Sequence, residues 1–217
     1  MDIVVAGADH AAATLVATGA VRMVRQWGLV SALAVAERAR ALAPSAAVAG
    51  DVDRVAPGVL EALPRTRWLD GNHEWFSFLD PESQLEIAIA KIFWIARRVG
   101  LDELRAALAK TLPATCAAPD RVLRRYLTEI AGCSIDGRFV RRASPERSCL
   151  TRREASIVKL LEAGGRDLDL KELRRRARAA ALPRTTVAQL IRLSPLFLLA
   201  AHRRVRLLGD GSRAIYA

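Results

Sequence analysis

The pattern of apolar residues predicts short amphipathic helices separated by small strands. In the middle of the chain Leu85, Ile89 and Ile92 recur at helical spacing and predict a helix over residues 83–98. A short strand, two further helices and a tight β-hairpin are expected to follow it. This order recurs along the chain and is that of a winged helix-turn-helix. The predicted fold class is mainly α with small β-hairpin wings, as three tandem winged helix-turn-helix units.

Two landmarks mark each repeat. The steps from the short strand into the second helix are expected within residues 25–31, 97–104 and 165–173. The hairpins are expected over residues 67–76, 133–140 and 197–207. Asp70 and Asp136, at the first two turns, are 66 positions apart, and each precedes a glycine that can adopt the positive φ of a tight turn. The predicted units are residues 1–80, 81–145 and 146–217.

The first unit is predicted to be structural or to bind a protein. Ser31 is expected to cap its second helix, which ends near residue 42. The inward-facing residues of that helix are expected to include Leu33, Ala36 and Leu42. The third helix is expected to begin at Asp51, and Asp53 then gives its first turn a second acid, as is usual at a helix start, rather than half of a metal pair. A helix that opens with two acids is poorly suited to DNA.

The third helix of the second unit is expected to begin at Pro119 and to leave basic residues outside. These residues are Arg121, Arg124 and Arg125. Two alternatives are open for them: contact with phosphates, or a solvated face. The following hairpin adds Arg138 at its turn, which favours DNA.

The third unit carries the clearest candidate for reading DNA. Thr151 and Glu154 have the spacing of a capping box, and Pro183 is expected to open the third helix. Its apolar residues would pack inward, leaving hydroxyl, amide and guanidinium groups for another surface. Such groups contact phosphates and base edges in the major groove. The candidate residues are Arg184, Thr185, Thr186, Gln189 and Arg192 on the helix and Arg203, Arg204 and Arg206 on the wing.

Charge is distributed unevenly among the three units. Residues 1–80 contain 7 Lys and Arg against 9 Asp and Glu, a net charge of −2. Residues 81–145 contain 11 against 7, a net of +4, and residues 146–217 contain 16 against 7, a net of +9. We therefore expect a polyanion such as double-stranded DNA to be bound mainly by the third unit, assisted by the second.

Several other classes of protein are disfavoured. No apolar stretch is long enough to cross a membrane, so no membrane partner is expected, and the N-terminus lacks the basic start of a secretory signal. The cysteines, Cys116, Cys133 and Cys149, are odd in number and widely spaced, which favours reduced thiols in the cytoplasm. No spacing typical of a metal site, a nucleotide loop or a hydrolase is present. The chain is expected not to be an enzyme and to need no cofactor or metal.

Part of the chain resembles region 4 of bacterial sigma factors. The similarity rests on Thr151 to Leu161, then on Leu170-Lys171-Glu172-Leu173 and the helix from Pro183 to Arg192. The two earlier repeats resemble bacterial proteins in which winged units precede such a module. In sigma factors the corresponding helix reads the −35 promoter element. This resemblance implies a base-reading role for residues 184–192 and a bacterial source.

Two functions follow from these observations. The first is a cytoplasmic, nucleoid-associated DNA-binding protein, a bacterial transcriptional regulator whose third unit reads double-stranded DNA. The alternative is a winged-helix scaffold that binds RNA polymerase or a subunit of a larger DNA-processing or defence complex through residues 1–80.

Overall fold

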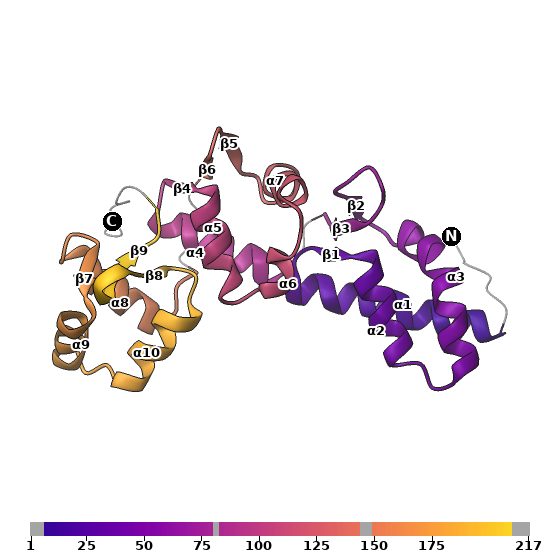
Figure 1. Ribbon diagram of the computed structural model, residues 1–217, viewed down its shortest axis with the longest axis horizontal. Helices are drawn as coiled ribbons and strands as arrows, with labels where there is room; N and C mark the ends of the chain where they lie inside the picture. Colours follow the sequence, from indigo (N-terminus) through magenta and orange to yellow (C-terminus); the bar gives the residue numbers. More distant parts are fainter. Residues whose placement is uncertain (1–6, 80–82, 144–148, 210–217) are drawn as a thin grey trace. The chain divides into compact units, whose positions relative to one another are not determined.

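The computed structural model describes residues 7–79, 83–143 and 149–209. It is mainly helical, with three three-stranded antiparallel sheets, one in each repeat (Figure 1). The predicted fold class is thereby confirmed. Contacts divide the chain into two compact units, residues 1–86 with 117–130 and residues 87–116 with 131–217. The second repeat contributes to both of these units.

The first repeat packs three helices against its sheet. Its elements are α1 (Gly7–Trp27), β1 (Val30–Ser31), α2 (Ala32–Ala41), α3 (Ala46–Ala62), β2 (Thr66–Trp68) and β3 (Trp75–Phe78). Val16, Ala20 and Val24 lie one turn apart on α1 and are fully buried, so α1 forms the centre of the core. Phe76 on the central strand β3 joins the same core.

Helix α3 begins earlier than the sequence predicted. The side chain of Ser45 accepts a hydrogen bond from the backbone N–H of Val48 and caps the helix. Asp51 and Asp53 therefore lie inside the helix, so the expectation that they form its acidic first turn is wrong. Asp51 instead forms an ion pair with Arg54 one turn later, at 3.0 Å.

Helix α2 faces the core with a different side than predicted. Ser31 caps it as expected, by accepting a hydrogen bond from the N–H of Ala34. Its buried residues are Val35, Ala36 and Ala39. Leu33 and Leu42, predicted to face inward, are 64% and 47% exposed. The side of α2 that faces the core is thus formed by small residues, and the two large leucines remain on the outer surface.

The turns of the first two hairpins differ. In the second hairpin Gly137 has a φ of 56°, as the Asp-Gly prediction requires. In the first hairpin the residue with positive φ is His73, at 55°, rather than Gly71. Oδ1 of Asp70 accepts hydrogen bonds from the N–H groups of Glu74 and Trp75, at 3.0 and 3.2 Å, and so stabilises this longer turn.

The second repeat follows the predicted order, with one added helical turn. Its elements are α4 (Gln84–Ile95), β4 (Arg98–Gly100), α5 (Leu101–Ala109), α6 (Pro113–Cys116), α7 (Asp120–Glu129), β5 (Ser134–Asp136) and β6 (Phe139–Arg141). Pro113 begins the one-turn helix α6. Helix α7 follows Pro119 as predicted, and it buries Val122, Tyr126 and Leu127.

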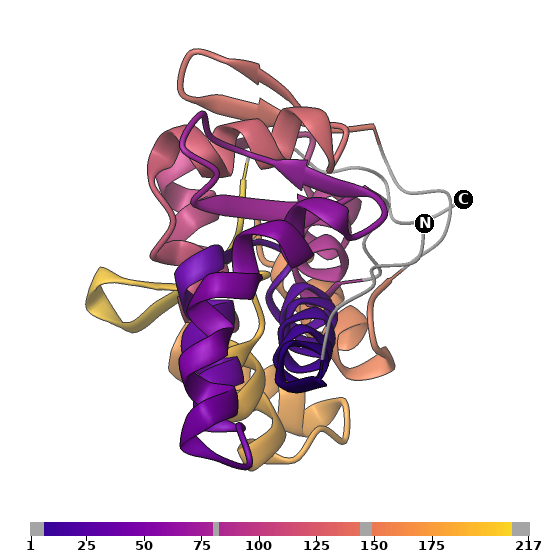
Figure 2. The ribbon, with the colours of Figure 1, turned by 90° about the vertical axis from the view of Figure 1, so that its right-hand side faces the viewer.

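The third repeat has the same order of elements. They are α8 (Arg152–Glu162), β7 (Asp167–Asp169), α9 (Leu170–Ala179), α10 (Arg184–Leu193), β8 (Phe197–Ala200), η1 (Ala201–Arg203) and β9 (Arg204–Leu207). The strand order β7-β9-β8 matches that of the other two sheets, with the last strand in the centre. Figure 2 shows the β8–β9 hairpin, in yellow, extending away from the helices of its repeat.

A buried carboxylate connects helices α4, α8 and α10. Glu154, 3% exposed, completes the predicted capping box by accepting a hydrogen bond from the N–H of Thr151 at 2.9 Å. Its two oxygens also accept hydrogen bonds from Nζ of Lys91 on α4, at 3.0 and 2.9 Å. The hydroxyl of Ser194, which follows α10, donates to Oε1 of Glu154 at 3.0 Å. One side chain thus fixes the start of α8 and the end of α10 relative to α4.

Further contacts hold α5 and the third repeat together in the second compact unit. Lys110, which follows α5, donates from Nζ to the backbone carbonyls of Ile191 and Phe197, at the end of α10 and the start of β8. A cation is favourable where α10 ends, because the last carbonyls of a helix lack intrahelical partners. Burial lowers the pKa of the Lys110 ammonium.

Replacing Glu154 by alanine should destabilise the chain strongly. The Glu154→Ala change removes the capping box and leaves Lys91, whose side chain is only 18% exposed, without its anion. We expect a loss of about 3 kcal/mol in the free energy of unfolding, measured by urea denaturation. Asp136→Ala, which removes an exposed carboxylate 3.7 Å from Arg141, serves as the control and should change stability little. Equal losses for the two variants would contradict a structural role for Glu154.

The carboxylate of Glu154 should also make the free energy of unfolding depend on pH in the acidic range. Burial alone would raise the pKa of Glu154, but hydrogen bonds from Thr151 and Lys91 outweigh it and lower the pKa below its usual value of 4.5. A lowered pKa in the folded state contributes stability above the unfolded pKa that is lost as the pH falls through the folded pKa. We expect Glu154→Gln to reduce this acid sensitivity in urea titrations between about pH 5 and 3. An unchanged pH profile would argue against the ion pair.

Candidate nucleic-acid interface

Helix α10 presents a polar ridge to the surface. Val187 and Ile191 are buried in the third repeat, as predicted. The exposed residues of the ridge are Arg184, Thr185, Gln189 and Arg192. The prediction that Thr186 also faces outward is wrong, because Thr186 is only 8% exposed. Helix α10 contains no Asp or Glu, so its exposed ridge carries no negative charge.

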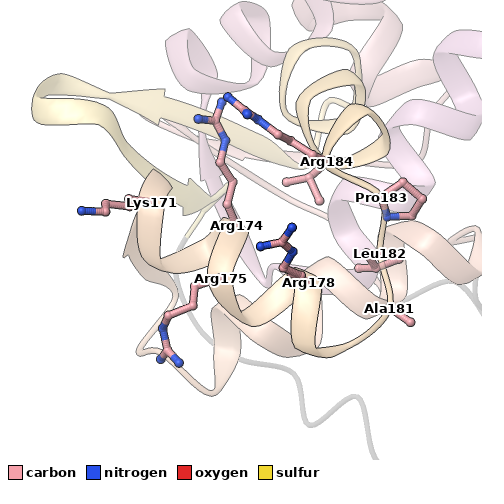
Figure 3. A pocket seen from close by; sticks show the side chains of 9 residues that line it. Lys171, Arg174, Arg175, Arg178, Ala181, Leu182, Pro183 and Arg184 are labelled. Carbon is pink, nitrogen blue, oxygen red and sulfur yellow. The ribbon is translucent and has the colours of Figure 1, made fainter.

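A basic cleft of about 630 Å³ lies between α9 and the start of α10 (Figure 3). Its cationic lining residues are Lys171, Arg174, Arg175, Arg178 and Arg184. In Figure 3 the side chains of Arg174 and Arg184 extend toward one another from the two helices. Nε of Arg174 is buried without a hydrogen-bond partner in the described part of the chain. Like charges gathered in this way favour an anion in the cleft.

Glu172 neutralises part of this charge. It accepts hydrogen bonds from Arg175 at 2.7 Å and from Nε of Arg176 at 2.6 Å. The hydrogen bonds from Arg175 and Arg176 lower the pKa of Glu172 to about 2, so its carboxylate stays ionised at neutral pH. Within the described residues, Arg174, Arg178 and Arg184 form no such ion pair. These three arginines, here called the open arginine group, are the cations of the cleft best placed to bind phosphate.

The start of α10 also favours an anion. Pro183 precedes the helix and, in the described structure, supplies no side-chain acceptor for the N–H groups of the first turn. The positive end of a helix and its unsatisfied N–H groups attract phosphate. Because Pro183 and Arg184 line the same cleft, backbone and side chains favour the same kind of ligand there.

A second cleft lies on the other side of the ridge. It has a volume of about 450 Å³ and is bounded by the start of α8 and by α10. Its lining residues are Thr151, Arg152, Arg153, Thr186, Gln189 and Leu190. Arg152 and Arg153 are both exposed. The polar ridge of α10 is therefore flanked by basic residues from α9 on one side and from α8 on the other.

The three predicted wing arginines of the third repeat differ in whether they form ion pairs within the chain. Arg203 is exposed at the turn, in a left-handed conformation with a φ of 58°. Arg204 forms an ion pair with Asp167 across the sheet at 3.0 Å. Arg206 lies 3.0 Å from Glu103 on α5. Of the three predicted wing residues, Arg206 is therefore also part of the contact between α5 and the third repeat.

The basic residues predicted in the second repeat fall in both compact units. Arg138 is exposed on the β5–β6 hairpin, and its guanidinium lies 5.1 Å from the centre of the Phe139 ring. Arg121, Arg124 and Arg125 lie on α7, which belongs to the first compact unit. Arg121 is exposed, whereas Arg124 and Arg125 are half-buried. Arg125 donates to Glu129 at 2.5 Å, and Glu129 also accepts a hydrogen bond from Arg67.

The sequence interpretation missed six basic residues that line the two clefts. They are Arg152, Arg153, Lys171, Arg174, Arg175 and Arg178. The sequence does show that the four α9 residues share one side of the helix, because positions 171, 174, 175 and 178 have helical spacings of three and four. The sequence does not show that α10 lies beside them and makes that side of α9 one wall of a cleft.

No protein-family profile and no curated protein sequence matches the chain. In the described ranges no helix is long and apolar enough to cross a membrane. The described residues also contain no group of three His, Cys, Asp or Glu placed to hold a metal ion. Within the described ranges, Cys133 and Cys149 form no disulfide.

Removing the charge of Glu172 should strengthen binding to polyanions. Glu172→Gln frees Arg175 and Arg176 from their shared carboxylate, so we expect elution from heparin at higher salt and several-fold tighter binding to duplex DNA. Glu37→Gln is a matched control, since it makes the same charge change at an exposed position of α2. Equal shifts for both variants would show that only net charge matters and would contradict the special role of the cleft.

Proposed function

We propose that the chain is a DNA-binding protein, a bacterial transcriptional regulator whose third repeat reads double-stranded DNA. The observation that carries this proposal is the exposed ridge of α10 with a basic cleft on either side. An α-helix with its side chains is about 10–12 Å wide, close to the width of the major groove. A helix lying in that groove has a phosphate backbone on each side, where this repeat has its arginines.

The ridge and the clefts would have different tasks. Gln189 can pair with adenine and Arg192 with guanine, since these side chains match the acceptors and donors on the base edges. The open arginine group and Arg152 with Arg153 would bind phosphates on opposite sides of the groove. Affinity would then come mainly from the clefts and discrimination among sequences from the ridge.

The wings would add backbone contacts. Arg203 and Arg204 extend the basic surface of the third repeat onto its hairpin, and Arg138 does the same for the second repeat. Arg121, Arg124 and Arg125 remain candidates for phosphate contact on α7. Contacts of this kind increase affinity without selecting a sequence.

A scaffold function for the first repeat is favoured by its third helix. Arg54 is the only basic residue of α3, and it is bound to Asp9 and Asp51. This helix therefore lacks the free cations of α9 and α10. We propose that residues 1–80 bind a protein, such as RNA polymerase or a subunit of a larger DNA-processing complex, while the third repeat binds DNA.

The open arginine group provides the test. Replacing Arg174, Arg178 and Arg184 by alanine should weaken binding to duplexes of any sequence. If each contacts one phosphate, the slope of log K against log salt should become less steep by about 0.9 per residue. The control is the double variant Arg22→Ala with Arg25→Ala. Both residues are exposed on α1, and their replacement should leave binding unchanged. Unchanged affinity and slope in the triple variant would overturn the assignment of this surface.

The ridge requires a separate comparison. Gln189→Ala should lower the preference for the best duplex in a randomised pool by about 1–3 kcal/mol while leaving the salt dependence unchanged. Fluorescence anisotropy with selected and scrambled duplexes measures both quantities. If the two duplexes lose affinity equally, Gln189 does not read a base.

A further inference from the structure

The first repeat has a cleft of about 210 Å³ that DNA binding does not explain. Leu33 and Ala36 of α2 line one side, Pro57 and Leu60 of α3 line another, and Trp68 of β2 completes the apolar lining. Leu33 is 64% exposed although it is a large aliphatic residue at the mouth of an apolar cleft. An exposed apolar surface that continues into a cleft is characteristic of a binding site for another molecule.

An aromatic pair forms the end of this cleft. The rings of Trp68 and His73 are stacked, with centres 4.8 Å apart and planes within 8° of each other. Nδ1 of His73 also lies 3.5 Å from Oε1 of Glu61. Aromatic rings held in place offer a large contact area at a small entropic cost, which is why they are common in the centres of protein interfaces.

The mouth of the cleft is acidic. On α3, Asp53, Pro57 and Glu61 follow one another at intervals of one turn, and the two carboxylate side chains are 60% and 59% exposed. On α2, Glu37 is exposed one turn after Leu33. Asp53 also contacts Arg40 at 3.2 Å. The two carboxylates of α3 that line the cleft, with Glu37 nearby on α2, favour an occupant that carries positive charge around an apolar group.

The size of the cleft favours a polypeptide over a free small molecule. Pockets that enclose drug-sized ligands are typically about 300–1,000 Å³, and this cleft is smaller. It has room for one large side chain. The exposed part of Leu33 and the carboxylates at the mouth would be covered only by an occupant that extends beyond the cleft.

We infer that this cleft binds a basic segment of a partner protein, with one large apolar or aromatic side chain inserted between α2, α3 and Trp68. The lysines or arginines beside that anchor lie against Asp53, Glu61 and Glu37. The inference goes beyond DNA binding, since the site is in the first compact unit and the open arginine group is in the second. A regulator built in this way connects the DNA bound by its third repeat to the partner bound by its first.

The test is selection from a library of short random peptides on beads, carried out on the full chain with Leu33→Glu protein as the counterselection. Because Leu33 is exposed, its replacement should leave the fold and the affinity for duplex DNA unchanged, which circular dichroism and anisotropy verify. Peptides that bind the wild type but not Leu33→Glu should carry one large apolar residue flanked by Lys or Arg. For these peptides Asp53→Lys with Glu61→Lys should weaken binding by ~10-fold or more.

Leu42→Glu is the matched control, since Leu42, which directly follows α2, is also an exposed leucine but does not line this cleft. It should bind the selected peptides as the wild type does. The inference is overturned if no peptide distinguishes the wild type from Leu33→Glu, if the distinguishing peptides are acidic or uncharged, or if Leu42→Glu loses them equally. The inference gives a site to the protein binding proposed for residues 1–80. None of these results would affect the proposed DNA binding, whose test uses duplex DNA and residues of the third repeat.

Discussion

The geometry of the third repeat depends on one buried carboxylate. Glu154 caps α8, binds the ammonium of Lys91 on α4 and accepts the hydroxyl of Ser194 at the end of α10. A buried charge is costly unless its hydrogen-bonding capacity is satisfied, so these partners specify one arrangement of the three helices. The ridge of α10 and the cleft between α8 and α10 can act as one surface because these helices are held in that arrangement.

Much of the fold could be predicted because its signals are local. The capping box at Thr151, the cap at Ser31 and the Asp-Gly turn at Gly137 each depend on residues a few positions apart. The start of α3 was missed because the acids at 51 and 53 resemble a first turn more than Ser45 does. Contacts distant in sequence gave no such signal: Lys91 and Glu154 are 63 positions apart, and nothing in the sequence pairs them.

In the candidate site, too, the features set by local sequence could be predicted, and those set by contacts distant in sequence could not. The exposed residues of α10 followed from helical periodicity, except for Thr186, which packing buries. Helical periodicity also places Arg174 and Arg178 on one side of α9, but that side forms a cleft only because α10 lies beside it. Which arginines are free depends on pairing with Glu172, and the engagement of Arg206 depends on Glu103 in the preceding repeat. Charge along the sequence therefore located the basic repeat but did not separate available cations from paired ones.

In the proposed function the third repeat, and not the first, binds DNA. Hydrogen–deuterium exchange of the full chain with and without a random duplex tests this directly, because every described helix is monitored in one experiment. We expect slower exchange in α9, α10 and the β8–β9 hairpin on addition of DNA, with α3 unchanged. Protection of α3 with none in α9 and α10, or no protection at low salt, would contradict it.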